Sequence, residues 1–318
     1  GGFAGEGTPD PNARDVDTYE TILSGDLAGN DGPGVSNYQD NARVIVASVS
    51  NDATAILDGF TITGGFGDSG PGLNCQDSSP IVEACTFRAN MAAGPDGGSG
   101  GAVSVSGGAP VFGRCAFAGN WAMGHGGAIR SQGRAHLTVQ RCTFTDNSAT
   151  DGGAIRCAAS DVNVVDCTFA GNLAEDHGGA FYSHQGKHVL AGCAFIGNSA
   201  KYGGAVYNLF GSMSLARCRF TANEAWEGGG AYIDASAAVT LTHCLIAGNR
   251  ACDWGGAVLA WCDSSPKLTN CTIADNRAPE GSAIAGGEPI LWNCIVWNQE
   301  PVKSLFRILG DGPTAGHS

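Results

Sequence analysis

The chain has 318 residues, with 17 Lys and Arg against 30 Asp and Glu, which gives a formal net charge of -13 at pH 7. An acidic chain is repelled by phosphate backbones, so nucleic acid is not expected as a partner, and the scarcity of lysine leaves no polybasic patch for a membrane surface. No apolar run is long enough to cross a bilayer, so no membrane insertion by this segment is expected.

Residues 1–68 contain stretches typical of β-strands but lack a regular motif. The stretches are residues 21–24, 43–49 and 55–63. Their aliphatic and β-branched composition predicts strands, and we interpret the segment as two or three irregular N-terminal coils of the solenoid that follows. The segment starts as if in mid-coil, without an amphipathic capping helix, which favours a processed or truncated chain.

A repeat with intervals of 23 to 30 residues occupies residues 69–298. Its first mark is a cysteine followed two positions later by Phe, Ile or Val. These cysteines are Cys85, Cys115, Cys142, Cys167, Cys193, Cys218, Cys244, Cys271 and Cys294. The second mark is an asparagine five residues after the cysteine, as at Asn147, Asn172, Asn198 and Asn223. The third is Gly-Gly-Ala-Ile or a close variant, first at 100–103. Such a period indicates a repeat architecture.

The segments between the marks identify the kind of repeat. Residues 162–169 alternate in the way of a strand with every second side chain directed inward. The return segment 148–157 has paired glycines in its middle and no helical period, which argues against leucine-rich, tetratricopeptide and ankyrin repeats. We therefore predict an all-β parallel β-helix, a single solenoid of about 10–12 three-sided coils. Residues 299–318 are expected to form a short C-terminal cap and tail.

The motif residues are predicted to be scaffold. The ladder cysteines Cys142, Cys167, Cys193 and Cys218 should stack inside as small apolar residues, without disulfides, because equivalent side chains on parallel rungs point the same way. Each asparagine should bond the turn backbone and the equivalent asparagine one coil on. A further inward column is expected at Cys75, Cys157 and Cys262, with a Cys252–Cys262 bridge as a minority alternative.

With these marks in place, residues 55–298 resemble the right-handed β-helix repeat proteins of the pectin-lyase-like superfamily. The segment Leu57-Asp-Gly-Phe-Thr-Ile-Thr-Gly-Gly65 and the two repeat motifs are similar to those of bacterial secreted or surface proteins, including chlamydial polymorphic membrane protein adhesins. The resemblance implies a right-handed helix, export, and an extracellular or bacterial cell-surface location. It implies no particular reaction, because the shared residues are scaffold.

One column of side chains is a candidate ligand surface. Beside the glycine corner, alternation places Arg130, Arg156, Tyr182 and Tyr207 outward on successive coils, followed by Ile233 and Leu259. Just before the corner lie His125, Asp151, His177, Tyr202, Trp226 with Glu227, and Trp254. Together they would form a ridge of aromatic, basic and acidic groups, in which aromatic faces stack on sugars and arginines pair with carboxylate or sulfate. His184 and His188 are expected on the surface nearby.

A metal site is a weaker hypothesis. Asp26, Asn30 and Asp31 lie in a glycine-rich loop and offer the oxygen ligands that a structural Ca²⁺ prefers, although the spacing of an EF-hand loop is missing. A polar loop without metal is the competing interpretation. No other cofactor is expected.

Three functions fit the sequence. The first is a non-catalytic surface protein for adhesion, glycan or matrix binding, or filament assembly, with end-to-end association through the open coil ends. The second is a polysaccharide lyase or related enzyme using Arg130, Arg156, Tyr182 and His177. The third is a structural spacer. Most coils span 25 to 27 residues, which leaves little chain for the walls of a deep cleft and ranks the enzyme second.

Overall fold

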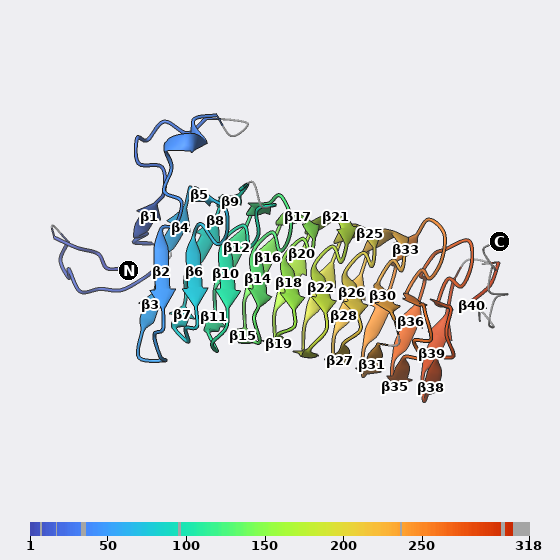
Figure 1. Ribbon diagram of the computed structural model, residues 1–318. Helices are drawn as coiled ribbons and strands as arrows, with labels where there is room; N and C mark the ends of the chain where they lie inside the picture. Colours follow the sequence, from blue (N-terminus) through green and yellow to red (C-terminus); the bar gives the residue numbers. More distant parts are fainter. Residues whose placement is uncertain are drawn as a thin grey trace, which may run out of the picture.

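The computed structural model describes residues 1–6, 8–16, 18–32, 36–94, 97–235, 237–299 and 303–307. From Ile22 onward these residues wind into one parallel solenoid of about 10 coils (Figure 1). The prediction of an all-β parallel β-helix is confirmed. The described part of the chain contains one short helix, the 3-10 turn η2 (Tyr38–Asp40), in a loop that stands out from the first coils. No helix among these residues is long and apolar enough to cross a membrane.

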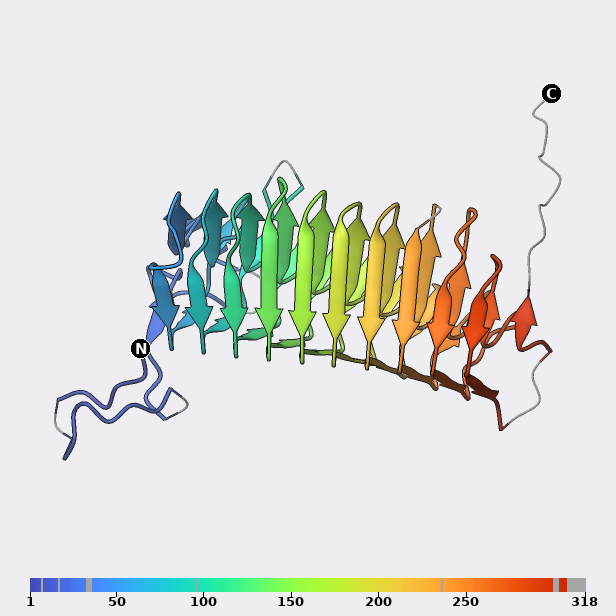
Figure 2. The same ribbon diagram turned by 90° about the horizontal axis from the view of Figure 1, so that it is seen from below.

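Each regular coil contributes four strands, so the expectation of three-sided coils is wrong. The strands stack into four parallel sheets, which we number in the order the chain visits them. Figure 2 shows the strands of successive coils lying one behind another along the solenoid. Sheet I has 11 strands: β1 (Ile22–Ser24), β4 (Thr61–Thr63), β8 (Thr86–Arg88), β12 (Ala116–Ala118), β16 (Thr143–Thr145), β20 (Thr168–Ala170), β24 (Ala194–Ile196), β28 (Arg219–Thr221), β32 (Leu245–Ala247), β36 (Thr272–Ala274) and β39 (Ile295–Trp297).

Sheet II is the additional face and has the shortest strands. Its 8 strands are β5 (Phe66–Gly67), β9 (Met91–Ala92), β13 (Trp121–Ala122), β17 (Ser148–Asp151), β21 (Leu173–His177), β25 (Ser199–Tyr202), β29 (Glu224–Glu227) and β33 (Arg250–Ala251). They fill the span between the asparagine turn and the glycine corner, which the sequence analysis described as part of a return segment without predicting a separate sheet.

Sheets III and IV complete the coil. Sheet III has 11 strands: β2 (Val46–Val49), β6 (Leu73–Gln76), β10 (Val103–Ser106), β14 (Ile129–Gln132), β18 (Ile155–Ala158), β22 (Phe181–His184), β26 (Val206–Leu209), β30 (Ala231–Asp234), β34 (Val258–Ala260), β37 (Ile284–Ala285) and β40 (Phe306–Arg307). Sheet IV has 10: β3 (Ile56–Asp58), β7 (Ile81–Glu83), β11 (Val111–Gly113), β15 (His136–Gln140), β19 (Asp161–Val165), β23 (Lys187–Ala191), β27 (Ser212–Ala216), β31 (Ala238–Thr242), β35 (Lys267–Thr269) and β38 (Ile290–Trp292).

Residues in the left-handed backbone region make the corners. In one coil these are Asp146, Gly152, Ala159 and Asp166, with φ of 53°, 65°, 47° and 52°. The glycine corner tolerates no side chain, because a Cβ built on Gly178 would lie 2.4 Å from the carbonyl oxygen of Phe181. The Gly-Gly motif is thus a steric requirement of the turn from sheet II to sheet III.

The interior is a set of side-chain ladders. Phe144, Phe169 and Phe195 are fully buried, and the centroids of neighbouring rings lie 4.7 and 5.0 Å apart. Asn172 Nδ2 donates to Asn198 Oδ1 at 2.9 Å and to the Phe144 carbonyl at 3.0 Å. The asparagine ladder therefore satisfies polar groups of the buried turn in every regular coil.

The thirteen cysteines are all free thiols, so the alternative of a Cys252–Cys262 bridge does not hold in this structure. Cys75 and Cys157 are fully buried, as expected, but Cys262 is exposed, because Ala260 pairs with Ile233 and takes the inward position. Burial raises the pKa of the Cys75 thiol to about 12, and the buried thiols are correspondingly inert.

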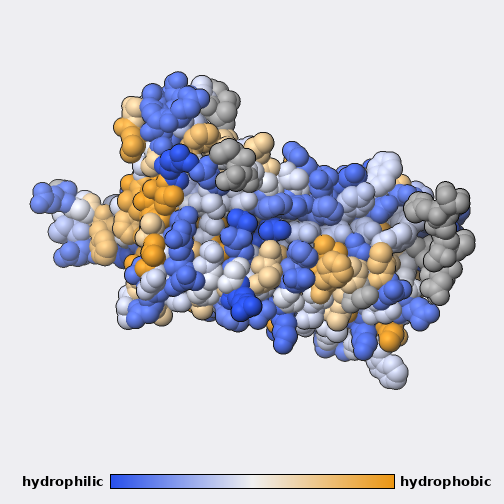
Figure 3. Space-filling model, in the orientation of Figure 1, coloured by the Kyte–Doolittle hydropathy of each residue, from blue (hydrophilic) through white to orange (hydrophobic). Residues whose placement is uncertain are grey.

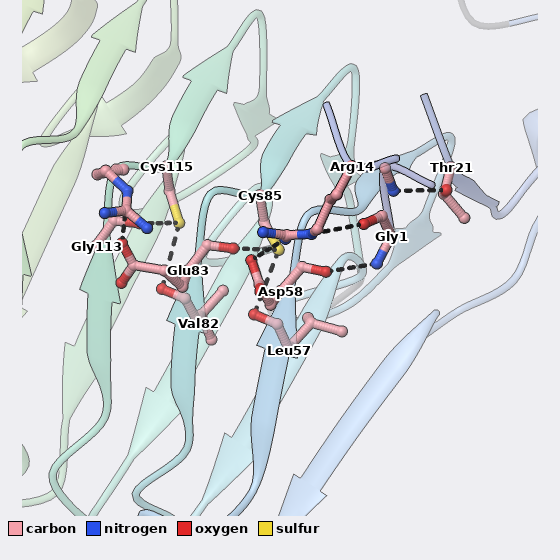
Figure 4. A network of polar contacts seen from close by, with 12 residues as sticks. Gly1, Arg14, Thr21, Leu57, Asp58, Val82, Glu83, Cys85, Gly113 and Cys115 are labelled. Atoms are coloured by element: carbon pink, nitrogen blue, oxygen red, sulfur yellow. Dashed lines mark hydrogen bonds and ion pairs between the residues drawn. The ribbon is translucent and has the colours of Figure 1, made fainter. Parts of the chain in front are cut away.

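The N-terminal residues fasten onto the first coil. The ammonium group of Gly1 donates to the Asp58 carbonyl at 2.7 Å, and Arg14 Nη2 lies 2.7 Å from Asp58 Oδ1 (Figure 4). At the other end, β40 pairs with β37, which places residues 306–307 in sheet III. Residues 300–302 and 308–318, where most of the predicted C-terminal cap and tail fall, lie outside the described residues.

Candidate functional site

The candidate site runs along the corner between sheets II and III, where outward side chains of the two sheets converge. On the sheet II side, paired positions on successive coils are Ser99, His125, Asp151, His177, Tyr202 and Glu227. On the sheet III side they are Ser104, Arg130, Arg156, Tyr182, Tyr207, Tyr232 and Leu259. We call this surface the corner groove.

A shift in strand register aligns the side chains at the centre of the corner groove. Among the strand pairs of the described residues, only β17–β21 and β21–β25 shift in register, and His177 pairs with Asp151 on one side and Tyr202 on the other. The cause is an extra residue in β21 compared with β17 and β25, which makes a β-bulge. Bulges bend a strand and re-aim side chains, and they are frequent beside functional sites.

Stacked tyrosines form the floor of the groove. Ring centroids of Tyr182 and Tyr207 are 5.5 Å apart, and those of Tyr207 and Tyr232 are 5.0 Å apart. The three side chains point away from the solenoid core yet are 5–7% exposed, because His177, Tyr202, Trp254 and Trp261 pack near them from the adjoining strands and turns. The predicted ridge is therefore wrong: these residues line a concave corner.

Arg130 and Arg156 lie side by side at the N-terminal end of the tyrosine run. They pair in register on β14 and β18, and the Arg156 guanidinium carbon lies 5.7 Å from the centroid of the Tyr182 ring. Neither forms a salt bridge with the described residues, and the Nε atoms of both are buried without a hydrogen-bond partner. Burial, together with the charge of Arg156, lowers the pKa of Arg130. Two neighbouring guanidinium groups without a protein carboxylate favour the binding of an anionic group at this place.

Two histidines flank one carboxylate on the opposite wall. His177 Nδ1 lies 2.7 Å from Asp151 Oδ1, and His125 Nδ1 lies 3.1 Å from Asp151 Oδ2 without the geometry of a hydrogen bond. Burial raises the pKa of Asp151, but the contacts with His125 and His177 outweigh it and hold the pKa well below its ordinary value. Asp151 is therefore an anion that orients the imidazole of His177.

Further along, the groove widens into a cavity of about 350 Å³. It is lined by His177, Tyr202, Tyr207, Glu227, Tyr232, Asp234, Trp261 and Cys262. The Tyr207 hydroxyl donates to Asp234 Oδ2 at 2.7 Å, and burial with the neighbouring Asp234 carboxylate raises the pKa of Tyr207. Burial also raises the pKa of Glu227. The cavity thus offers aromatic faces next to hydrogen-bond acceptors.

The structure places the predicted ligand residues as follows. Arg130, Arg156, Tyr182, Tyr207, His177 and Tyr202 come together, and Trp254 joins them through Trp261, with ring centroids 5.3 Å apart. Trp226 is 55% exposed and takes no part in this cluster. Ile233 was placed outward by the sequence analysis, but it is buried in the core, because Gly230 precedes Ala231 and shifts the motif by one residue.

Three groove residues were missed by the sequence analysis: Tyr232, Asp234 and Trp261. Tyr232 could have been found from the sequence. If Val206-Tyr207 is aligned with Ala231-Tyr232, so that the extra glycine before Ala231 is treated as an insertion, Tyr232 takes the position of Tyr207. Asp234 and Trp261 have no such signal, because they lie beyond the motif. His188, expected on the surface, is 1% exposed and points into the core between Val162 and Met213 on adjacent strands.

The candidate calcium loop is held by its own amides. Asp26 Oδ1 accepts from the Asn30 N–H at 3.1 Å, and Asp26 Oδ2 accepts from the Asp31 N–H at 3.2 Å. Asn30 Nδ2 in turn donates to Asp40. Within the described ranges, no group of three or more His, Cys, Asp or Glu side chains is arranged to hold a metal. Calcium binding in this loop stays a prediction.

Comparison with known proteins identifies the family. A family model described as a right handed beta helix region matches residues 44–213 and 100–273. The chain belongs to this right-handed β-helix family. No curated protein and no solved structure matches significantly. Membership fixes the handedness of the coil and agrees with the parallel sheets, whereas a fold of this kind hosts many activities.

Proposed function

We propose that this β-helix protein is secreted or displayed at the cell surface and binds an acidic glycan along the corner groove. The observation that carries the proposal is the pair Arg130 and Arg156. In a chain of net charge -13, carboxylates are abundant, and Arg114, for example, lies 2.9 Å from Glu83. The groove pair has no such partner among the described residues, so a carboxylate or sulfate supplied by a ligand would satisfy it.

The aromatic floor supports a carbohydrate rather than a small anion. Tyr182, Tyr207 and Tyr232 present stacked rings over three successive coils, with Trp254 and Trp261 beyond them. Successive coils are about 4.8 Å apart, so this surface extends along the axis and matches an elongated polymer. Sugar rings stack on such aromatic faces, while polar groups at the edges hold their hydroxyls.

One further feature supports export, and a second is compatible with it. The repeat motifs resemble those of bacterial surface proteins, and the ladder thiols are protected from oxidation. Ten of the thirteen cysteines are buried. Disulfide chemistry requires a thiolate, so buried neutral thiols persist in an oxidising compartment.

Binding is tested by calorimetric titration with polygalacturonate, alginate, hyaluronan and chondroitin sulfate, with dextran as the neutral comparison. We expect binding to at least one acidic polymer, weakened by added salt and by Arg156→Ala or Arg130→Ala. Arg217→Gln is the matched control, because Arg217 is an exposed arginine in the turn between β27 and β28. Absence of binding to every acidic polymer would instead support the structural spacer.

End-to-end self-association is a second proposal, and it rests on the two ends of the solenoid. The last strands of sheets I and IV carry Ile290, Trp292, Ile295 and Trp297, all 53–73% exposed, where the preceding coil has Lys267 and Thr272 at paired positions. Hydrophobic residues also gather over the first coils, where Ile22, Val49 and Ile56 are exposed (Figure 3). Unpaired strand edges template pairing with a second copy. Sedimentation velocity should show association that Trp292→Ser with Trp297→Ser abolishes.

A further inference from the structure

The loop between β1 and β2 carries three carboxylates, those of Asp26, Asp31 and Asp40, and stands out from the first coils (Figure 1). None of the three forms a salt bridge with a described residue. Arg43 is the only basic residue of the loop, and it pairs with Asp68 instead. Like charges in one loop repel each other, so a cation bound among them would stabilise the loop.

Two buried oxygen atoms at the base of this loop lack a hydrogen-bond donor among the described residues. They are Asp31 Oδ1 and Asn41 Oδ1. Asn41 is only 6% exposed, and its Nδ2 donates to Asp31 Oδ2 at 2.8 Å, so its amide faces the Asp31 carboxylate. A buried acceptor without a partner is costly, and a cation that contacts both oxygens would remove that cost.

The hydrogen bonds of Asn41 determine which way its amide points. Its Nδ2 donates both to Asp31 Oδ2 and to the Gly64 carbonyl, each at 2.8 Å. If the amide were turned over, its oxygen would face these two acceptors and the repulsion would be larger. The orientation with Oδ1 unpartnered is therefore the favoured one, and the amide oxygen is left for a group that carries positive charge.

We propose that Asp31 and Asn41 bind one Ca²⁺ at the base of this loop, where the loop joins the first coil. Both side chains offer oxygen, which is the ligand that calcium prefers, and water would complete a shell of about six to eight oxygens. Asn41 also bonds to the carbonyl of Gly64, directly after β4, so the ion would fasten the loop to the solenoid. The proposal is independent of glycan binding in the corner groove.

Asp26 has a positioning role in this proposal. Its Oδ1 and Oδ2 accept the N–H groups of Asn30 and Asp31 at 3.1 and 3.2 Å, which holds the backbone of Asp31 in place. The Asn30 side chain donates to Asp40 Oδ2 at 3.0 Å. The proposed ligand pair therefore differs from the triple Asp26, Asn30 and Asp31 of the sequence analysis, because Asn41 lies 10 residues after Asp31 in the chain.

Tyr38 offers a way to observe the ion directly. Burial raises the pKa of its hydroxyl, and the negative charges of Asp31 and Asp26 raise it further, because the phenol lies near both carboxylates. The Tyr38 ring packs edge-on against Phe66 of β5, with ring centroids 6.0 Å apart. A tyrosine held beside the site can transfer its excitation to terbium, a luminescent ion that binds to the same kind of oxygen ligands as calcium.

The test starts from the whole chain, freed of metal by a chelator. Calcium binding is measured by calorimetry, and terbium luminescence is excited through tyrosine. We expect one site with a Kd of roughly 10⁻⁴–10⁻³ M, in the range of weak calcium sites, and terbium emission that added calcium suppresses. Tyr38→Phe should lose the emission but keep the calcium affinity, because the phenol is not a ligand.

Two variants test the ligands themselves. Asp31→Asn should weaken calcium binding by roughly 10-fold or more, because it removes the negative charge next to the ion. Asn41→Asp keeps an oxygen at Oδ1 and adds a charge, so it should bind calcium more tightly and gain more thermal stability from calcium than the parent does. Asp52→Asn is the matched control, because Asp52 is an exposed carboxylate in the turn between β2 and β3, and it should leave binding unchanged.

The outcomes that overturn the site are distinct. If the parent shows neither calcium heat nor terbium emission at millimolar ion, water is the partner of the two oxygens and the proposal is wrong. If folded Asp31→Asn binds calcium like the parent, or Tyr38→Phe keeps the terbium emission, the ion lies elsewhere and the proposal is equally wrong. Circular dichroism verifies that each variant is folded.

Discussion

Two stacks of aromatic rings run along this solenoid, one inside and one outside. The inner stack, from Phe87 to Phe220, has ring centroids 4.7–5.0 Å apart and neighbouring planes within 14° of each other. The outer stack, Tyr182 to Tyr232, has wider spacings of 5.0 and 5.5 Å and planes inclined by 24° and 29°. Both follow from the same rung register, because equivalent side chains lie over one another in parallel strands.

The two stacks differ in what they can be used for. Each phenylalanine is enclosed by four sheets, so its removal leaves a cavity in the core. Each tyrosine is buried outside the four sheets, under side chains of the adjoining strands and turns, and keeps a polar hydroxyl. The coil can form without the outer stack, so the outer rings are available to contact a ligand.

The sharpest way to test this difference is to remove one ring from each stack. Phe169→Ala should destabilise the solenoid by about 3–5 kcal/mol, because it empties a fully enclosed site. Tyr182→Ala, on the same coil, should cost about 1–2 kcal/mol, because the ring packs in a small cluster outside the core and surface side chains can close over the gap. Urea unfolding followed by circular dichroism measures both. Equal shifts of the unfolding midpoint would show that the outer stack is as structural as the inner one.

The buried asparagine ladder gives a second contrast with the corner groove, which has no comparable ladder of hydrogen-bonded amides among the described residues. Asn172→Ala removes an amide whose Oδ1 accepts from Asn147 N and Nδ2 and whose Nδ2 donates to Asn198 Oδ1. The neighbouring groups are left buried without partners, so we expect a loss of about 1–3 kcal/mol in unfolding free energy. Ser199→Ala, at a half-buried position on β25, is the control and should stay within about 0.5 kcal/mol.

The fold was predictable from the sequence because each coil repeats the same residue types at positions with fixed structural roles. Cys, Phe and Asn recur at the positions where a small apolar group, a large ring and a turn amide are required. Sheet II was not predictable, because its strands such as β17 (Ser148–Asp151) lie in the segment next to the glycine corner and carry half-buried polar residues. Short polar strands are paired through backbone groups alone, and composition does not show that pairing.

The groove wall can be tested through its charge. Burial raises the pKa of Asp151, but the contacts with His125 and His177 outweigh this and lower the pKa overall. A carboxyl with a lowered folded pKa stabilises the fold above its unfolded pKa of about 3.9 and loses that contribution as pH falls through the folded pKa. Asp151→Asn should therefore reduce stability by about 1 kcal/mol at pH 7, and the difference should vanish in strong acid. Melting temperatures between pH 2 and about 7 measure this. A constant offset would contradict it.

The candidate site was only partly predictable. Alternation identified Arg130, Arg156 and Tyr207, because each is the second residue of its sheet III strand, where the side chain points away from the core. The burial of Tyr207 and the partial burial of the two arginines were not foreseen, because they depend on how sheets II and III meet. The pairing of His177 with Asp151 depends on the bulge in β21, which one additional residue creates. The repeat interval varies from 23 to 30 residues, so one additional residue in a strand lies within the normal range and does not reveal a register shift.

The smallest expected effect concerns His188, which is buried in the core on a sheet IV strand. His188 is buried against Phe181, its Nε2 donates to the Gln185 carbonyl at 3.1 Å, and its Nδ1 has no partner. Burial lowers its pKa, so the unfolded chain binds the proton more readily, and stability falls as pH drops below about 6.5.

His188→Met should remove this pH dependence, since Met213 fills the equivalent position one coil on. The Gln185 turn is exposed, so water can replace the lost donor, and the change at pH 8 should stay within about 1 kcal/mol. Below pH 6 the variant should be more stable than the parent by thermal melting, because its core holds no group that gains a charge. If the two chains lose stability in parallel from pH 8 to about 5, the acid sensitivity belongs to another group.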